Sequence, residues 1–189
     1  MGNTDMDIDP DSCRPAGDQV ENRSLAQALA ELHPDCFGWA LGCCAWNREE
    51  AEDVLQTVYL KILDGRARFA GKSSVKTWLF AVIRHTAAHR RRRQWLLDLL
   101  PERLVRQVPE LQTVPDSESL AAASETSRAL RAALLKLAER QRHALHLVFY
   151  EGLSIEEAAV VLGISVGSAR THYHRGKERL RQLLGKRYA

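Results

Sequence analysis

Residues 152–184, GLSIEEAAVVLGISVGSARTHYHRGKERLRQLL, place the tightest limit on how this chain can fold. Ser154 and Glu157 have the spacing of a capping box, which opens a short helix. The inward-facing positions of that helix are Ala158, Ala159 and Leu162. Gly163 suits the left-handed residue of a tight turn, and Ser165 suits the cap of a following helix. The segment therefore predicts a helix-turn-helix, in which the second helix enters the major groove of DNA.

The second helix of this segment has an apolar side and a basic side. Its predicted buried side consists of Val166, Ala169, Tyr173, Gly176, Leu180 and Leu183. The outward-facing side chains, which we predict to bind DNA, are Ser168, Arg170, Thr171, His172, His174, Arg175 and Lys177. Arginine pairs with guanine edges, whereas lysine and hydroxyl groups hold phosphates. The alternative is an ordinary helix pair with a solvated charged face; the capping box, the turn glycine and the dense cations favour DNA binding.

The rest of the chain also has helical periodicity, and no strand pattern occurs, so we predict an all-α protein. Leucines recur over residues 25–32, and Pro34 ends that helix or opens one that runs to about Trp46. Asn47 suits the cap of a helix over Glu49–Asp64. The core face of that helix is Val54, Leu55, Val58 and Ile62. After a basic loop at residues 65–74, a helix from Val75 through Arg93 starts apolar and ends in cations. Ahead of the helix-turn-helix, a further stripe consists of Leu130, Leu134, Leu137, Ala144, Leu145 and Val148.

Charge divides the chain into four segments that the formal net charge of +3 conceals. Residues 1–23 carry −4, 24–95 carry +4, 96–126 carry −4 and 127–189 carry +7. Two basic modules indicate polyanion binding at two places. We predict a disordered acidic extension at 1–23, a helical domain at 24–95, a flexible acidic linker at 96–126 and a helix-turn-helix domain at 127–185.

Length and composition exclude several classes of protein. A chain of 189 residues forms one medium or two small domains, which excludes a large multidomain enzyme. No apolar run could cross a bilayer and no signal peptide opens the chain, so we expect a cytoplasmic protein without membrane insertion. Reduced thiols are then favoured over disulfides for Cys13, Cys36, Cys43 and Cys44. Together with His33, the residues Cys36, Cys43 and Cys44 contain enough ligand atoms for zinc, but they lack CxxC spacing. Ordinary thiols are therefore favoured, and we expect no metal or cofactor.

Residues 49–93 contain a second set of motifs. An acidic AED precedes a Q-x-x-[FY]-L-[RK] helix, and after a short loop a TWL helix ends in basic residues. Together with the helix-turn-helix, these motifs resemble the extracytoplasmic-function (ECF, group 4) sigma factors of the sigma-70 family of RNA polymerase sigma factors. The resemblance covers about residues 24–95 and 127–185, in the order found in the family.

The resemblance implies an alternative sigma factor, which is not itself an enzyme and has core RNA polymerase and promoter DNA as partners. Region 2 at 24–95 would bind the β′ clamp helices and melt the −10 element, and region 4 at 127–185 would contact the β flap and read the −35 element. The implied polymerase-binding residues are Glu52, Asp53, Gln56, Tyr59 and Lys61. The implied −10 residues are Phe69, Lys72, Ser73, Ser74, Lys76, Trp78, Arg84, Arg90 and Arg91. Taken without the resemblance, the first set reads as a solvated helix face and Trp78 as a core residue.

Three features depart from the family or leave alternatives open. His85 and His89 stand where members commonly have Asn and Asp, so the base preference is undetermined. Thr57 stands where many have an acid, and phosphorylation would restore negative charge there. In the linker, Asp116 and Glu118 would mimic nucleic acid in the RNA exit path, or the linker is a plain tether. The resemblance leaves open an anti-sigma factor or a kinase as regulator.

Two other functions compete with this interpretation. One is a helix-turn-helix regulator that binds an operator without polymerase, but a sensor domain has no reason to carry the motifs of residues 49–93. The other is a metal-dependent nuclease built on His33, Cys36, His85, His89, His143 and His146. Those residues are scattered and include no HExxH motif or paired acids, which disfavours the nuclease.

Overall fold

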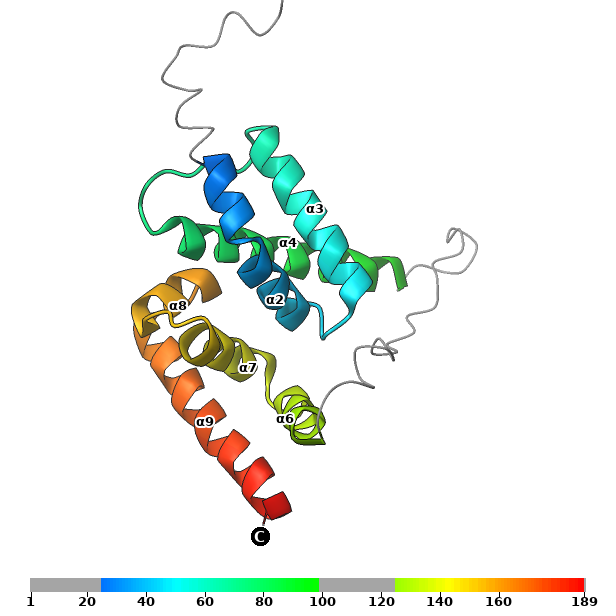
Figure 1. Ribbon diagram of the computed structural model, residues 1–189, viewed down its shortest axis with the longest axis vertical. Helices are drawn as coiled ribbons and strands as arrows, with labels where there is room; N and C mark the ends of the chain where they lie inside the picture. The colour runs from blue at the N-terminus through cyan, green and yellow to red at the C-terminus, as the bar shows by residue number, and fades with distance from the viewer. Residues whose placement is uncertain (1–24, 99–124, 189) are drawn as a thin grey trace, which may run out of the picture. The chain divides into compact units, whose positions relative to one another are not determined.

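The computed structural model describes residues 25–98 and 125–188. Within these ranges the chain is helical apart from short turns and contains no strand (Figure 1), so the predicted all-α class is confirmed. The predicted disorder of residues 1–23 and almost all of the predicted linker at 96–126, with Asp116 and Glu118, lie outside the described residues.

The chain divides into two compact units, residues 1–33 and residues 34–189. In the first unit, residues 25–31 are helical, and Gln27 Nε2 donates to Glu31 Oε1 one turn later, at 3.0 Å. The second unit starts in the first turn of α2 (His33–Cys43) and contains the helices from α2 to α9.

Helices α2, α3 (Arg48–Leu63) and α4 (Val75–Asp98) form what we call the first block. The predicted cap of α3 is confirmed, because Asn47 Oδ1 accepts from the Glu50 amide at 3.1 Å. The four residues predicted as the core face of α3 are all buried. The predicted end of α2 near Trp46 is wrong: the helix stops at Cys43 because Ala45 and Trp46 adopt left-handed φ angles of 52° and 69°.

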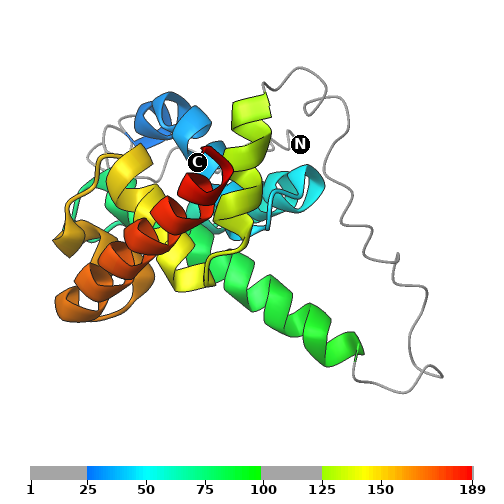
Figure 2. The ribbon, with the colours of Figure 1, turned by 90° about the horizontal axis from the view of Figure 1, so that it is seen from below.

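Helix α4 continues to Asp98, five residues beyond the predicted end at Arg93. Its first half is packed into the unit, with Leu79, Phe80 and Ile83 fully buried. Its second half extends beyond the neighbouring helices (Figure 2) and exposes Arg90 to Arg93 to solvent. The change along α4 from apolar to cationic residues therefore corresponds to a change from buried to solvated helix.

The second block consists of α6 (Glu125–Leu135), α7 (Glu139–Leu145), the π-helix η2 (His146–Tyr150), α8 (Ile155–Leu162) and α9 (Val166–Tyr188). The long α9 packs along α6, α7 and α8 (Figure 1). The predicted stripe is out of phase in α6, where Leu130 is exposed and Leu134 only half-buried. The buried positions of α6 are Ala129 and Ala133, whose small side chains allow close helix approach.

The predicted helix-turn-helix is confirmed in detail. Ser154 Oγ accepts from the Glu157 amide at 3.1 Å, and Glu157 Oε2 accepts from the Ser154 amide at 2.9 Å, which completes the capping box. Gly163 ends α8 with a left-handed φ of 58°, and Ser165 Oγ accepts from the Ser168 amide at 3.2 Å. One predicted burial is wrong: Val166 is exposed, because the packed face of α9 begins only at Ala169.

The two blocks pack against each other within the second unit, mainly through α8 on α4. Trp39 of α2 is fully buried at this contact, and its Nε1 donates to the Phe80 carbonyl at 2.9 Å. The same indole ring lies 5.1 Å from the ring of His143 and 5.2 Å from that of His146. A side chain of the first block is therefore enclosed partly by residues of the second.

Candidate nucleic-acid interface

The outer face of α9 presents polar and basic side chains as predicted. Six of the seven predicted DNA-binding residues are exposed and His172 is half-buried, whereas Ala169 and Gly176 on the opposite face are buried. Arg170 lies 3.9 Å from Glu156, but both side chains are more than half exposed, so this pair holds the arginine weakly. The arrangement can place arginines and hydroxyls along a groove without disturbing the core.

The loop between α3 and α4 carries four of the predicted −10 residues, and the other five lie on α4. Gly65 and Gly71 allow its turns, with left-handed φ angles of 67° and 68°. The rings of Phe69 and Trp78 lie 5.4 Å apart and both residues are half-buried, so the loop packs on the first turns of α4 while part of the aromatic surface stays accessible. Lys72 and Ser74 are exposed, and Ser73 is half-buried.

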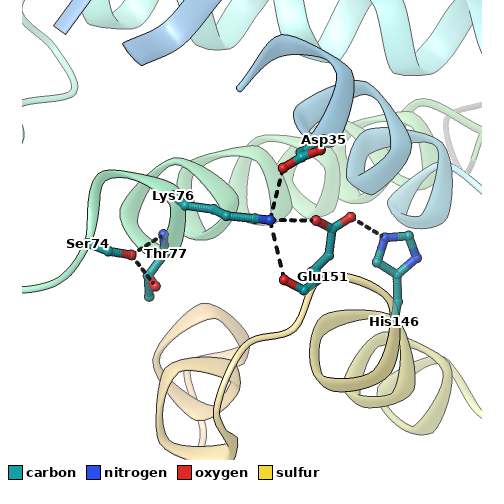
Figure 3. Close-up of polar contacts among 6 residues, drawn as sticks. All are labelled: Asp35, Ser74, Lys76, Thr77, His146 and Glu151. Carbon is teal, nitrogen blue, oxygen red and sulfur yellow. Dashed lines mark hydrogen bonds and ion pairs between the residues drawn. The ribbon is translucent and has the colours of Figure 1, made fainter. Parts of the chain in front are cut away.

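Lys76 has acidic partners on both sides (Figure 3). Its Nζ lies 2.9 Å from Asp35 Oδ2 and 3.0 Å from Glu151 Oε2, and it also donates to the Glu151 carbonyl at 3.3 Å. Burial lowers the pKa of Lys76, but the hydrogen bonds to Asp35 and Glu151 outweigh it, so the pKa lies above its ordinary value. The lysine is therefore a cation with an exposed fraction of only 25%.

The predicted DNA-binding arginines of α4 differ in their surroundings. Arg90 Nη2 lies 2.6 Å from Asp53 Oδ2, and Arg91 Nη2 lies 2.8 Å from Glu139 Oε1. Arg84 is half-buried, and its Nε has no hydrogen-bond partner among the described residues. It lines a cavity of about 40 Å³ together with Cys43, Ala87, Ala88, Arg91, Glu139 and His143. A cavity of that size and polarity has room for water.

The five predicted polymerase-binding residues of α3 fall into two groups. Glu52 and Gln56 are exposed, and Tyr59 follows them on the same helix face. Tyr59 is half-buried, and this burial raises its pKa to about 12. Asp53 and Lys61 are engaged with α4 instead: Asp53 pairs with Arg90, and Lys61 Nζ donates to Thr86 Oγ1 at 3.0 Å.

Two comparisons of sequence identify the family. Residues 29–96 match the family model Sigma-70 region 2, and residues 127–180 match Sigma-70, region 4. The chain is 34% identical to the ECF RNA polymerase sigma factor SigX of Bacillus subtilis over 143 residues, which cover 72% of this chain and 71% of that protein. The RNA polymerase sigma factor CarQ of Myxococcus xanthus is 34% identical over 139 residues, which cover 74% of this chain and 77% of CarQ. This chain belongs to the ECF sigma factors of the sigma-70 family.

As a sigma factor, the protein binds core RNA polymerase and promoter DNA and directs transcription initiation. Its fold agrees with solved sigma factors. RpoE of Bartonella quintana, solved with the anti-sigma factor NepR, superposes with a TM-score of 0.65 at 24% identity and covers 86% of this chain and 98% of that one. CnrH, solved with the cytosolic domain of CnrY, superposes with a TM-score of 0.60 at 21% identity, and the match covers 87% of this chain and 90% of CnrH. Because residues 29–96 match region 2, this segment is not the sensor domain of a classical helix-turn-helix regulator.

The cysteines of this sigma factor that the structure describes are buried and free. Burial raises the pKa of Cys36 and of Cys44 to about 12, which keeps both thiols protonated and unreactive. Within residues 25–98 and 125–188, no group of three or more His, Cys, Asp or Glu side chains is placed to hold a metal ion. Cys13 lies outside the described residues. Over the same ranges, no helix combines the length and apolarity needed to cross a membrane.

Thr57 of this sigma factor is half-buried on α3. Its Oγ1 donates to the Asp53 carbonyl one turn earlier, at 2.8 Å. The hydroxyl that phosphorylation would modify is therefore engaged within the helix, next to the Asp53–Arg90 ion pair.

Sequence reasoning missed two sets of functional candidates. Leu60 and Leu63 on α3 are large, apolar and exposed. Both lie outside the predicted core face of α3, and this could have indicated an apolar surface for a partner. Glu139, Glu151 and Glu157 of the second block contact residues of the first block. No local pattern predicts those contacts, because the partners are 48 to 80 residues apart in the sequence.

Proposed function

We propose that this sigma factor reads the −35 element with the outer face of α9 and holds the melted −10 element with the loop before α4 and the start of that helix. The observation that carries the proposal is the division of α9 between a buried face of small residues and an exposed face of arginine, lysine, histidine and hydroxyl side chains. The domains we assign to the two elements are residues 127–185 and residues 24–95.

The loop supports recognition of an opened strand. Lys72, Ser73 and Ser74 supply donors for bases and phosphates, and the Phe69–Trp78 pair offers aromatic surface for an unstacked base. Farther along α4, the exposed Arg90 and Arg91 are suited to the duplex backbone upstream. Their contribution is electrostatic, so it should fall as salt rises.

Helix α3 is the proposed site for the β′ clamp helices of the polymerase. Glu52, Gln56 and Tyr59 follow one helix face, and the exposed Leu60 and Leu63 add apolar surface beside them. Large exposed apolar side chains next to polar ones are typical of protein interfaces. In this proposal the chain supplies no catalytic group, and phosphodiester formation belongs to the polymerase.

Selection of duplex DNA by the reconstituted holoenzyme tests the −35 assignment. Arg175→Ala should lower the preference for one base pair of the selected −35 sequence by about 5-fold to 150-fold, the range expected for one arginine–base contact of about 1 to 3 kcal/mol. Arg179→Ala is the matched control on the same helix, because Arg179 is exposed and bonds Gln182 within the helix at 3.3 Å. Equal base preferences for both variants and the parent protein would contradict the assignment.

A further inference from the structure

Carboxylates of the second block hold three polar side chains of α4. Glu151 pairs with Lys76 and Glu139 pairs with Arg91, at 3.0 Å and 2.8 Å. Thr77 Oγ1 donates to Glu157 Oε1 at 3.3 Å. Glu139 begins α7, Glu151 follows η2 and Glu157 lies in the first turn of α8, so all three glutamates come from one continuous stretch of the second block.

We propose that this face of region 4 is an internal competitor of promoter DNA. In the packed arrangement the three glutamates take the places that phosphates or base edges would take, and the two blocks must separate before the −10 element can bind. The inference rests on the DNA-binding roles proposed for Lys76 and Arg91.

The contact between Lys76 and Glu151 is the centre of this competition. The Glu151 side chain is only 2% exposed, and its second oxygen, Oε1, lies 3.1 Å from His146 Nε2 (Figure 3). A carboxylate buried to this extent is stable only with its partners. Lys76 therefore neutralises the charge of Glu151 in the packed arrangement. A DNA phosphate that binds Lys76 would have to displace the Glu151 carboxylate.

The first turn of α4 is covered in the same way. Thr77 is fully buried, and Ser74 Oγ accepts from its amide at 3.1 Å (Figure 3). Glu157 caps α8 and also accepts from Thr77; the Ser154 amide is the main reason that the pKa of Glu157 is lowered, and Thr77 adds to it. The first turn of α4, which we propose to lie beside the melted bases, is thus covered by the start of α8.

The remaining contact is suited to reversible opening. Arg91 and Glu139 are both about half exposed, which makes their ion pair weak. Beside it lies the cavity of about 40 Å³, where Arg84 Nε and the buried His143 Nε2 have no hydrogen-bond partner in the part of the chain that the structure describes. An interface with unsatisfied polar groups is less stable than a domain core, so the polymerase and DNA can open it.

The test uses the full chain and two readouts: the affinity for a fluorescent single-stranded DNA of random sequence, and the radius of gyration from small-angle X-ray scattering. Glu151→Gln should raise the affinity about 3-fold to 10-fold over the matched control and increase the radius of gyration. The matched control is Glu156→Gln, which removes the same charge from a side chain on α8 that is 63% exposed. Among the described residues, Glu156 forms an ion pair with Arg170 alone, at 3.9 Å. Glu139→Gln, at a side chain that is 44% exposed, should show the same changes to a smaller extent.

Equal affinities and equal radii for Glu151→Gln, Glu139→Gln and Glu156→Gln would overturn the proposal. If the Glu151→Gln protein expands but no variant binds single-stranded DNA, the competitor role falls together with the DNA-binding role of the loop, although the packing of the blocks stands. Tighter DNA binding without expansion would also overturn it, because separation of the blocks is the proposed cause.

Discussion

Gly176 sets the distance between two helices of region 4. A Cβ at this position would lie 3.1 Å from the Gln141 carbonyl oxygen and 3.2 Å from Leu145 Cδ1. Because the nearest atom belongs to the backbone of α7, it cannot rotate away. The close crossing of α7 and α9, which positions the exposed basic face of α9, therefore depends on the missing side chain.

Gly176→Ala should destabilise the protein by about 1 to 3 kcal/mol, the usual cost of overpacking, despite the better helix propensity of alanine. Gly167→Ala is the matched control, since no atom lies within 4 Å of a Cβ there. Urea unfolding of both variants measures the difference. A Gly176→Ala protein as stable as the Gly167→Ala protein would show that α7 and α9 can move apart at little cost.

At the scale of single residues, the sequence predicts what depends on near neighbours. The sequence predicted the helix caps at Asn47 and Ser154 and the left-handed turn at Gly163, because each depends on residues within four positions. Glu151 was not, because its role depends on Lys76, 75 residues away. The same limit explains why Lys76 was predicted as a DNA contact without its two acidic partners.

Among the helices, α3 combines three roles on different faces. One face fills the core, one pairs with α4 through Asp53 and Lys61, and one presents Gln56 and the two exposed leucines. Periodicity predicted the core face of α3 correctly, because the buried positions of a helix recur every three to four residues. It could not separate the other two faces, because charged residues occur on both.

If phosphorylation of Thr57 supplies the missing negative charge on α3, Thr57→Val should activate the target promoter less than the parent protein in cells. The two purified unmodified proteins should bind core polymerase equally in a pull-down, because valine removes only the hydrogen bond to the Asp53 carbonyl. Equal promoter activation in cells would rule out a role for the modification.

Across the whole molecule, the packing of the two blocks makes stability depend on pH through His143. Burial, followed by the nearby Arg142 and Arg84, lowers the pKa of His143 to about 4, against the opposing effect of Glu139. In the unfolded chain a histidine titrates near pH 6.5. Between about pH 6.5 and 4 the unfolded state therefore binds more protons, so stability falls as the pH drops through this window and is unaffected by His143 above it.

The free energy of unfolding should fall by about 2 kcal/mol between pH 7.5 and pH 5 because of this one group. Urea titrations at the two pH values measure the fall. His143→Gln should flatten the pH dependence, whereas His85→Gln, at an exposed position, should leave it unchanged. A parent protein equally stable at both pH values would contradict the buried neutral state of His143.

The arrangement of the blocks is the part of the fold that no sequence pattern predicted. The helices of each block could be predicted from periodicity and motifs, since caps, turns and core faces are set by residues close together in the sequence. The packing of α8 on α4 joins segments about 80 residues apart. The partners of the buried Trp39 in the second block, His143 and His146, are more than 100 residues away, so no local pattern indicates them.

In vitro transcription with purified core RNA polymerase on a genomic promoter library tests most directly whether this chain is a promoter-reading subunit. We expect transcripts that require both the chain and the polymerase, from a minority of promoters that share one −35 and one −10 sequence. Transcripts that are the same with and without the chain, or that start without a shared sequence, would contradict it.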